Sequence, residues 1–333
     1  MKIAVLGSGS WGTALAQVLS DNRHDVTIWG NNLDQIVDIS LYHSNEQFFP
    51  GVKVNADIKA TQDLNDVAAC EMFILAVPSI AIEEVCLRLN SVLDHPAIIV
   101  SVAKGFHPVT KERLSEVVKR SIYPLYNQSI VCLIGPSHAE EVVLRLLTSV
   151  NAVSDNEDAA SCVQSVFSNA YFRVYRGSDL IGSEIGVAIK NIIAIGAGIL
   201  TGLGQGDNAR AALITRGLAE MTRFGVAHGA QAMTFLGLTG VGDLVVTATS
   251  EHSRNFNAGL LIGQCDDAKP FWDKNEFTVE GVFATKVVHE LAIASSISMP
   301  ITAAIYAVLY QNSKPSMMVE SLMQRELKDE KIV

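Results

Sequence analysis

The sequence predicts an α/β protein in which a doubly wound parallel sheet is followed by an all-α C-terminal domain. Three observations support this fold class. Short apolar segments alternate with helix-like segments in the first half of the chain. A glycine-rich turn directly follows the first apolar segment. From about residue 180 onward, long stretches have helical spacing and few strand-like runs.

Two domains are expected, because 333 residues exceed the length that one hydrophobic core usually serves. Apolar residues make up 49% of the chain and charged residues 18%, a composition typical of a well-filled globular protein. The change of pattern near residues 178–182 places the boundary so that the domains cover residues 1–180 and 181–333.

The strands expected in the first half are short and almost wholly apolar. Parallel strands that helices cover on both faces are buried on both sides, which explains such runs. The expected strands are KIAVLG (2–7), DVTIWG (25–30), EMFILAVP (71–78), PAIIVSVAKG (96–105) and SIVCLIGPS (129–137), and the first helix is WGTALAQVLSD (11–21).

Helices dominate the expectation for the second half. The segment over residues 185–203 has the length of a membrane span, but Lys190, Asn191 and four glycines favour a buried helix. Three more helices are expected over residues 208–229, with an end at Gly225 or Gly229, and over residues 285–297 and 317–327.

Charge and cysteine content limit the partners and the compartment. The net charge is −10 and the sequence pI is about 5.3, which argues against nucleic acid and anionic membranes as partners. The buried helix expected over residues 185–203 argues against stable membrane insertion. The first ten residues contain a run of only four apolar residues, which is too short for the core of a signal peptide. Five scattered cysteines without a CxxC pair favour reduced thiols in the cytoplasm: Cys70, Cys86, Cys132, Cys162 and Cys265.

The turn GSGSWG places Gly7, Gly9 and Gly12 in a G-x-G-x-x-G pattern between the first strand and the first helix. In a Rossmann-like domain, the first glycine permits a tight turn, the second admits the dinucleotide pyrophosphate, and the third allows close helix–strand packing. The alternative is a tight turn without a ligand. The position of the pattern after an N-terminal strand favours dinucleotide binding.

The second expected strand ends without the carboxylate that usually binds the ribose 2′-hydroxyl of NAD. Asn31 and Asn32 occupy this region, and Asp34 lies a few residues beyond the position at which that carboxylate is expected. No carboxylate repels a 2′-phosphate there, and no arginine holds one. The sequence therefore allows NADP and does not exclude NAD.

Lys190 is the one charged residue in the apolar segment 185–200. Gly186, Ala194 and Ala197 are small, and we expect them to leave room for a ligand at the ammonium. Partial burial would lower the pKa of such a lysine and suit it to proton transfer. The structural alternative is a lysine whose side chain extends to the surface.

Three further segments carry polar candidates. Lys104 follows an apolar strand at the sheet edge where ligands bind in such folds. Asp243 lies in a glycine-rich turn, and Ser253 is a candidate N-cap for a helix that begins with Arg254. A helix N-terminus with a guanidinium forms a good phosphate site. A surface lysine, a turn aspartate and a capped helix are the alternatives when each is taken alone.

These segments together resemble one family from residue 1 to about residue 310. The similar stretches are GSGSWGTALA, LAVPS, AKGF, GPSHAEE, GVAIKNIIAIGAGILTGLGQGDNARAALITRGLAEM, GLTGVGDLVVTATS and SRNFNAG. They resemble NAD(P)-dependent glycerol-3-phosphate dehydrogenase of the bacterial type. The resemblance implies reversible reduction of dihydroxyacetone phosphate to sn-glycerol 3-phosphate with NADP or NAD as cofactor, feeding glycerophospholipid synthesis.

The same resemblance implies the roles of individual residues, and no metal ligand is among them. Lys190 would donate and accept the proton, with Lys104 and Asp243 completing the catalytic group. The substrate contacts would be Lys104, Gly135, Ser137, Lys190, Asp243, Ser253, Arg254 and Asn255. The cofactor contacts would be Gly7, Gly9, Ser10, Trp11, Gly12, Asn31, Lys104, Ala139, Arg254 and Glu280.

Two positions depart from the family pattern. Asn31 stands where many relatives carry a basic or imidazole side chain, and His138 stands where an aromatic residue is frequent.

Two alternatives remain: a β-hydroxyacid dehydrogenase or ketopantoate reductase of the same fold, and a non-catalytic dinucleotide sensor. The hydroxyacid type carries an asparagine at the place of Ala194, and a sensor has no need of the lysines. A homodimer is compatible with the sequence, which does not decide the oligomeric state.

Overall fold

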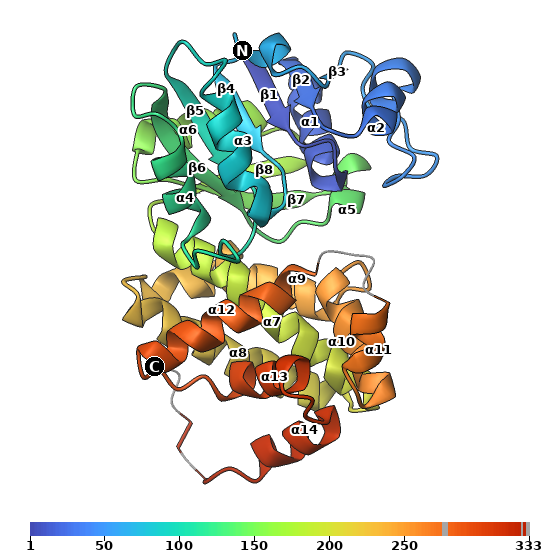
Figure 1. The fold of residues 1–333 in the computed structure, drawn as a ribbon, viewed down its shortest axis with the longest axis vertical. Coiled ribbons are helices and arrows are strands. Elements are labelled where there is room, and N and C mark those ends of the chain that lie inside the picture. Colours follow the sequence, from blue (N-terminus) through green and yellow to red (C-terminus); the bar gives the residue numbers. More distant parts are fainter. Residues whose placement is uncertain (275–278, 328, 331–333) are drawn as a thin grey trace. The chain divides into compact units, whose positions relative to one another are not determined.

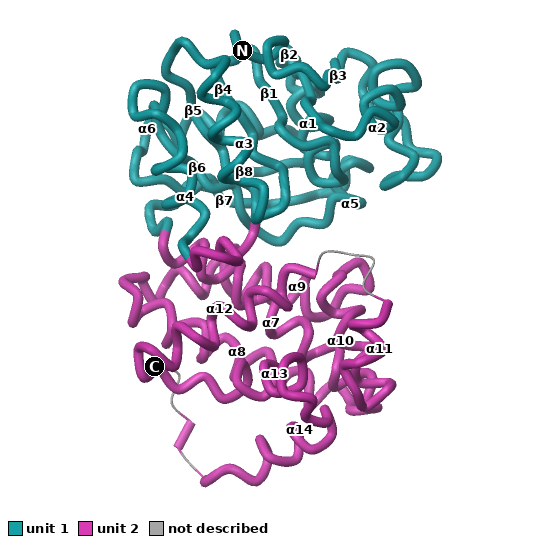
Figure 2. Tube along the Cα trace, in the orientation of Figure 1, with its two compact units in different colours: residues 1–103, 112–180 teal, residues 104–111, 181–333 magenta. Residues whose placement is uncertain are grey.

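A computed structural model describes residues 1–274, 279–327 and 329–330 (Figure 1). The chain forms two compact units, one over residues 1–103 and 112–180 and the other over residues 104–111 and 181–333 (Figure 2). The sequence suggested a single division after residue 180. The structure adds the short segment 104–111 to the second unit, although the chain on both sides of it belongs to the first.

The first unit contains an eight-stranded sheet with the order β3-β2-β1-β4-β5-β6-β7-β8. Strands β1 to β6 are parallel, β7 runs antiparallel to β6, and β8 is parallel to β7. The chain reverses its direction of winding between β1 and β4, as in a doubly wound fold. The strands are β1 (Lys2–Leu6), β2 (Asp25–Trp29), β3 (Lys59–Thr61), β4 (Met72–Leu75), β5 (Ala97–Ser101), β6 (Asn127–Ile134), β7 (Thr148–Val153) and β8 (Phe172–Gly177).

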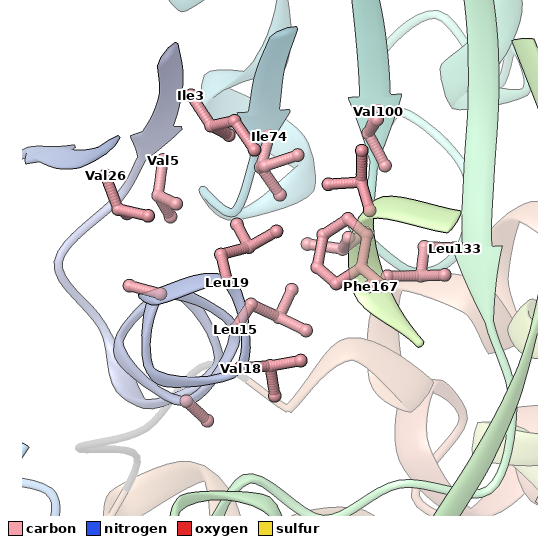
Figure 3. Close-up of a cluster of buried hydrophobic side chains, with 14 of the residues drawn as sticks. Ile3, Val5, Leu15, Val18, Leu19, Val26, Ile74, Val100, Leu133 and Phe167 are labelled. Carbon is pink, nitrogen blue, oxygen red and sulfur yellow. The ribbon is translucent and has the colours of Figure 1, made fainter. Parts of the chain in front are cut away.

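Successive side chains of a strand point to opposite faces of the sheet, and helices cover both faces here. The central strands are therefore apolar on both faces. Ile3 and Val5 of β1 join one core with Leu15 and Leu19 of helix α1 (Ser10–Asp21) (Figure 3). The intervening residues Ala4 and Leu6 belong to a second core on the other face. Helices α5 (Ala139–Val143) and α6 (Glu157–Phe167) cover the first face with α1, and helices α3 (Ile82–Leu89) and α4 (Leu114–Ser121) cover the second.

The short elements of the first unit are α2 (Leu33–Val37), η1 (Asp38–Tyr42), η2 (Leu64–Val67) and η3 (Ser79–Ala81). The five expected strands are present. Strands β3, β7 and β8 were not expected from the sequence. In β7 and β8 buried residues alternate with more exposed ones, so these strands lack the continuous apolar runs that revealed the central ones.

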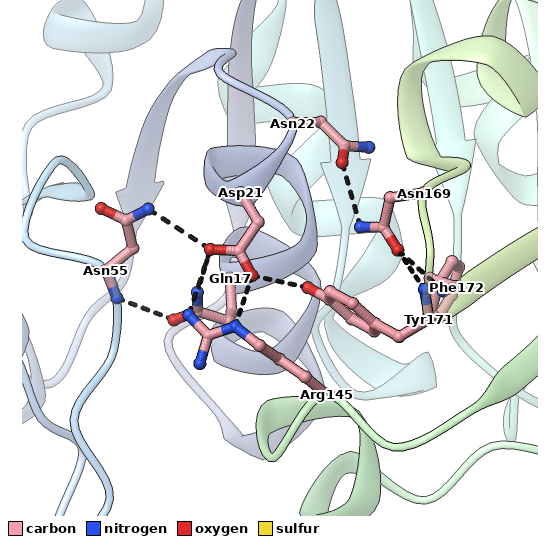
Figure 4. Close-up of polar contacts among 8 residues, drawn as sticks. All are labelled: Gln17, Asp21, Asn22, Asn55, Arg145, Asn169, Tyr171 and Phe172. Atoms are coloured by element: carbon pink, nitrogen blue, oxygen red, sulfur yellow. Dashed lines mark hydrogen bonds and ion pairs between the residues drawn. The ribbon is translucent and has the colours of Figure 1, made fainter.

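A polar network fixes the C-terminal end of α1 within the first unit (Figure 4). The Asp21 carboxylate accepts hydrogen bonds from the Arg145 guanidinium at 2.8 and 3.1 Å and from the Tyr171 hydroxyl at 2.7 Å. Gln17 Nε2 donates to the same carboxylate at 2.6 Å. The network joins segments more than 120 residues apart in sequence, and it holds the helix whose other end follows the glycine turn.

Helix α7 (Leu180–Gly202) lies in the core of the second unit. Its most apolar stretch of 18 residues is 89% buried. The buried helix expected from the sequence is therefore present. The other elements are α8 (Asp207–Ala227), η4 (Ala232–Leu236), η5 (Leu238–Gly242), α9 (Asp243–Thr249), α10 (Arg254–Cys265), α11 (Lys269–Asp273), α12 (Glu280–Ala294), α13 (Pro300–Tyr310) and α14 (Pro315–Met323). The described residues of this unit form no named strand.

Glycines allow α7 and α10 to pack backbone against backbone. A Cβ at Gly259 would lie 2.0 Å from the carbonyl oxygen of Ile195, and a Cβ at Gly198 would lie 2.0 Å from that of Phe256. Neither distance is compatible with a side chain. Gly198 is thus required in α7 by the close approach of α10.

We expect Gly259→Ala to destabilise the second unit by about 1–3 kcal/mol, since the added methyl group must push α10 away from α7. Gly206→Ala is the matched control, because a Cβ at Gly206 meets nothing within 4 Å. The urea midpoint of unfolding, followed by circular dichroism, measures the difference. Equal midpoints for the two variants would contradict the proposed close packing.

Candidate functional site

The parallel strands of the first unit bring several predicted residues to one edge of the sheet. Gly7 follows β1, Asn31 comes shortly after β2, and Gly135 follows β6. Because these strands are parallel, their carboxyl ends lie at the same edge. In open α/β sheets ligands bind at this edge, close to the point where the winding reverses between β1 and β4.

The three glycines of the turn have different local environments. Gly7 has a φ of +129°, and a Cβ there would lie 2.4 Å from the carbonyl oxygen of Ala76. A Cβ at Gly12 would lie 2.0 Å from the carbonyl oxygen of Gly7. At Gly9, the N-cap of α1, an added Cβ would meet none of the described residues within 4 Å. The backbone N–H groups at the start of α1 can therefore be approached by an anionic ligand.

Asn31 and Asn32 differ in how the structure uses them. The Asn32 side chain caps α2 and accepts hydrogen bonds from the backbone N–H groups of Asp34 and Gln35 at 3.0 and 3.3 Å. Asn31 is exposed, and its backbone carbonyl accepts a hydrogen bond from Gln62 Nε2. Of the two, Asn31 is the side chain available to a bound ribose.

Other predicted contacts of the first unit follow β6 or begin the next helix. Ser137 Oγ donates to the carbonyl oxygen of Gly135 at 3.0 Å, so the turn after β6 is locally ordered. A Cβ at Gly135 would lie 2.8 Å from Val150 Cα, which requires glycine at this position. Ala139 is the first residue of α5 and follows the N-cap His138. Ser10 and Trp11 form the start of α1.

Lys190 and Asp243 form a buried ion pair in the second unit. The Lys190 ammonium on α7 donates to the Asp243 carboxylate on α9 and, at 3.1 Å, to the Thr247 hydroxyl. Lys190 is 2% exposed and Asp243 is 0% exposed. The alternative of a lysine that reaches the surface is therefore wrong.

Burial lowers the pKa of Lys190 from 10.5 to about 8. The Asp243 carboxylate opposes this shift, the charge of Lys104 adds to it, and Glu280 opposes it more weakly. Burial dominates because the charged ammonium loses its hydration in the apolar interior. A lysine with such a pKa can both donate and accept a proton near neutral pH, as acid–base catalysis requires.

One carboxylate oxygen of Asp243 is buried and has no hydrogen-bond partner among the described residues. A buried charged oxygen without a partner is unfavourable, so an unsatisfied one in a folded protein calls for an explanation. Asp243 Oδ1 is occupied by Lys190 and Thr247. The capacity of Oδ2 to accept a hydrogen bond is unused among the described residues.

The start of α12 is attached to α7 and α10. Asn191 Nδ2 donates to the Glu280 carboxylate at 3.5 Å, and the backbone N–H of Gly281 donates to Asn255 Oδ1 at 2.9 Å. Asn255, predicted as a substrate contact, therefore already uses one side-chain atom within the protein. Ser253 caps α10 by accepting a hydrogen bond from the backbone N–H of Phe256 at 3.2 Å, which confirms the expected N-cap. The next residue, Arg254, is exposed.

The expectation that small residues leave room for a ligand beside Lys190 is wrong at Gly186. A Cβ there would lie 2.5 Å from the carbonyl oxygen of Thr239, so the space is filled by the backbone of η5. Ala194 and Ala197 are both 0% exposed. These small residues accommodate neighbouring elements, and the close approach of η5 brings the adjoining Asp243 toward Lys190.

The predicted site residues divide between the two units. The glycine turn, Asn31, Gly135 and Ala139 belong to the first, and Lys104, Lys190, Asp243, Ser253, Arg254, Asn255 and Glu280 to the second. Hydrogen bonds join Lys190 with Asp243, and Asn255 with the start of α12. Sequence reasoning missed Thr247. Its spacing four residues after Asp243 on a helix was the available signal.

Comparisons with known proteins agree over nearly the whole chain. Residues 2–160 match the family model of the NAD-dependent glycerol-3-phosphate dehydrogenase N-terminus, and residues 179–320 match that of the C-terminus. The chain is 48% identical over 332 residues to glycerol-3-phosphate dehydrogenase [NAD(P)+] of Listeria monocytogenes serotype 4b, with 99% of this chain and 98% of the relative covered. It is 46% identical over 330 residues to the protein of the same name from Streptococcus equi subsp. zooepidemicus, with 99% and 97% covered.

Solved structures show the same similarity. The crystal structure of glycerol-3-phosphate dehydrogenase from Coxiella burnetii has a TM-score of 0.91 at 36% identity and covers 97% of this chain and 99% of that one. A ketopantoate reductase from Ralstonia eutropha has a TM-score of 0.60 at 13% identity, with 97% and 100% covered. The second comparison shows a shared fold alone.

We expect Thr247→Val to lower the free energy of unfolding by about 1.5–3 kcal/mol, since it removes an acceptor from the buried Lys190 ammonium without much change in shape. Thr249→Val is the control, because that exposed hydroxyl donates only to a backbone carbonyl of α9. Urea unfolding of both variants provides the measurement. A loss at Thr247 no larger than that at Thr249 would show that the hydroxyl does not support the ammonium.

Proposed function

The chain belongs to the NAD-dependent glycerol-3-phosphate dehydrogenase family, and we propose that Lys190 is the proton donor and acceptor of its reaction. The protein is an NAD(P)-dependent glycerol-3-phosphate dehydrogenase, which interconverts dihydroxyacetone phosphate and sn-glycerol 3-phosphate. The observation that carries the proposal is the buried Lys190–Asp243 pair, in which burial lowers the pKa of Lys190 to about 8.

The first unit contributes the residues proposed to hold the dinucleotide. The N-terminus of α1 would receive the pyrophosphate over Gly9, because oriented N–H groups and the helix dipole favour an anion there. Ser10 and Trp11 would contact the cofactor beside this turn. Asn31 would contact the adenosine ribose, and Ala139 would contact a part of the cofactor further from the turn. The bound cofactor supplies the hydride that reduces the ketone carbon.

Lys190 would donate its proton to the carbonyl oxygen as negative charge develops there. Asp243 and Thr247 hold the ammonium in one position, so the proton is presented in a fixed direction. Lys104 carries a positive charge that already acts on Lys190 and would also stabilise the developing oxyanion. Asp243 Oδ2 would accept a hydrogen bond from a substrate hydroxyl, which satisfies the otherwise unpartnered atom.

Arg254 and the N-terminus of α10 would bind the substrate phosphate. The exposed guanidinium follows directly on the capping Ser253, so a fork-shaped cation and a helix N-terminus occur together. Binding of the phosphate, which is remote from the reacting carbon, would help to orient that carbon. Gly135, Ser137 and Asn255 are proposed as further substrate contacts, and Arg254 and Glu280 as further cofactor contacts.

Both dinucleotides are proposed to bind, with NADPH somewhat preferred. The support is the exposed Asn31 after β2, where no carboxylate is placed to repel a 2′-phosphate. The ratio of kcat/KM for NADPH and NADH measures the preference. A ratio of about a hundredfold in favour of NADH, which corresponds to nearly 3 kcal/mol, would contradict it.

The cytoplasm is the proposed location, and glycerophospholipid synthesis is the proposed use of the product. Five free cysteines, three of them buried, suit a reducing compartment. The Listeria and Streptococcus relatives carry the same enzyme name, and sn-glycerol 3-phosphate has the glycerol backbone and phosphate that such lipids contain. A homodimer stays a prediction.

We expect Lys190→Arg to lower kcat by at least about a hundredfold, because a guanidinium keeps the charge but does not give up its proton near neutral pH. Lys190→Ala should lose as much activity and also melt at a lower temperature, because Asp243 then lacks its cation. Lys286→Arg on α12, an exposed lysine, is the control. NADPH titration must show that the folded variants still bind cofactor. A folded Lys190→Arg protein with turnover close to that of the parent would end the proposal.

Arg254→Lys tests the phosphate site by replacing a bidentate donor with a point charge. We expect kcat/KM for dihydroxyacetone phosphate to fall at least about tenfold, while the much weaker reduction of unphosphorylated dihydroxyacetone changes little. Steady-state kinetics with both substrates at saturating NADPH provide the measurement. Equal losses for the two substrates would show that Arg254 does not recognise the phosphate.

A further inference from the structure

Residues 104–111 form a folded segment that belongs to the helical unit, although the chain enters it from β5 and leaves it toward α4, both in the other unit (Figure 2). The segment is internally ordered. The backbone N–H of Thr110 donates to His107 Nδ1 at 3.2 Å, and that of Lys111 donates to the His107 carbonyl oxygen at 2.9 Å. His107 itself is 5% exposed.

Two contacts attach this segment to the second unit. Phe106 is 7% exposed and is part of the same apolar core as Ile189 and Ile192 of α7, which lie one residue before and two residues after Lys190. At the other end of the segment, the Lys111 ammonium lies 2.7 Å from the Glu290 carboxylate of α12. The ion pair is partly exposed and contributes little, so the buried aromatic ring is the main anchor.

Lys104 precedes this anchor by two residues. Gly105 lies between them with a φ of +101°, a left-handed conformation that sets the direction of the chain from Lys104 to Phe106. Lys104 is close enough to Lys190 for its charge to act on that ammonium. The two lysines are therefore held by one folded unit, even though Lys104 follows a strand of the other.

We propose that Phe106 is a positioning residue for the reaction, which anchors residues 104–111 in the core of the helical unit and thereby fixes the position of Lys104 relative to Lys190. The inference rests on the proposed function, in which both lysines act on the substrate carbonyl. Phe106 touches neither substrate nor cofactor in this proposal. Its effect reaches the reaction through the position of Lys104.

The proposal has a consequence that a purely structural role for Phe106 lacks. Among the described residues, the charged groups that act most strongly on Lys190 are Asp243 on α9, Lys104 on the anchored segment and Glu280 on α12. Of these, Lys104 alone lowers the pKa of Lys190, and the two carboxylates raise it. If the segment loses its anchor and Lys104 moves away, the pKa of Lys190 must rise.

The experiment measures kcat/KM for dihydroxyacetone phosphate against pH in the parent and in Phe106→Ala. Reduction requires protonated Lys190, so activity declines as the pH rises through its pKa. We expect the decline in Phe106→Ala to move to higher pH by at least about half a unit, and kcat/KM at pH 7 to fall about tenfold or more. Phe224→Ala is the matched control, a buried aromatic residue of the same core on α8. Its decline should stay at the parent's pH.

A Lys104→Met background distinguishes the possible causes. With Lys104 absent, Phe106→Ala should shift the decline no further, because the two changes act through the same charge. Two results would overturn the proposal. One is a folded Phe106→Ala protein whose kcat/KM declines at the same pH as that of the parent. The other is a shift of this decline by Phe106→Ala that is as large with Lys104→Met as with Lys104 present. If Phe106→Ala does not fold, Phe106→Leu is read by the same two criteria. An unchanged Lys104→Met enzyme would instead overturn the catalytic role of Lys104 in the proposed function.

Discussion

A lysine–aspartate pair buried between two helices is the interaction on which the site depends. Lys190 and Asp243 are both almost inaccessible to solvent, and their side chains form an ion pair. Removal of one partner of such a pair typically costs about 3–5 kcal/mol, because an uncompensated charge stays in the interior. The pair therefore constrains α7 and α9 to one arrangement. The same burial that makes the pair costly also lowers the pKa of Lys190 into the range useful for proton transfer.

Close backbone packing provides the rigidity that this arrangement needs. Gly186 lets η5 approach α7, which places Asp243 at the start of α9, and Gly259 lets α10 approach the same helix. In the first unit, Gly12 plays a comparable part by admitting the backbone of the glycine turn. Each unit thus uses glycine where a functional segment must lie against a helix. The functional side chains come from the elements that these contacts fix in place.

Local patterns made much of this predictable from the sequence. Apolar runs revealed the central parallel strands, the glycine turn has the expected shape, and Ser253 caps its helix. What could not be predicted depends on tertiary contacts. Small residues beside Lys190 suggested space for a ligand, but Gly186 is filled by the η5 backbone. Residues 104–111 belong to the helical unit, in whose core Phe106 is buried. A single aromatic residue in the sequence does not indicate in which unit it will be buried.

The central claim is that burial brings the ionisation of Lys190 close to neutral pH, and a direct titration tests it most plainly. Lysine labelled with ¹³C at Cε and ¹⁵N at Nζ would report the ionisation by NMR, and Lys190→Arg would identify the resonance. We expect a midpoint at about pH 8 for Lys190 in the unliganded enzyme. A midpoint near the ordinary lysine value of 10.5 would contradict the account.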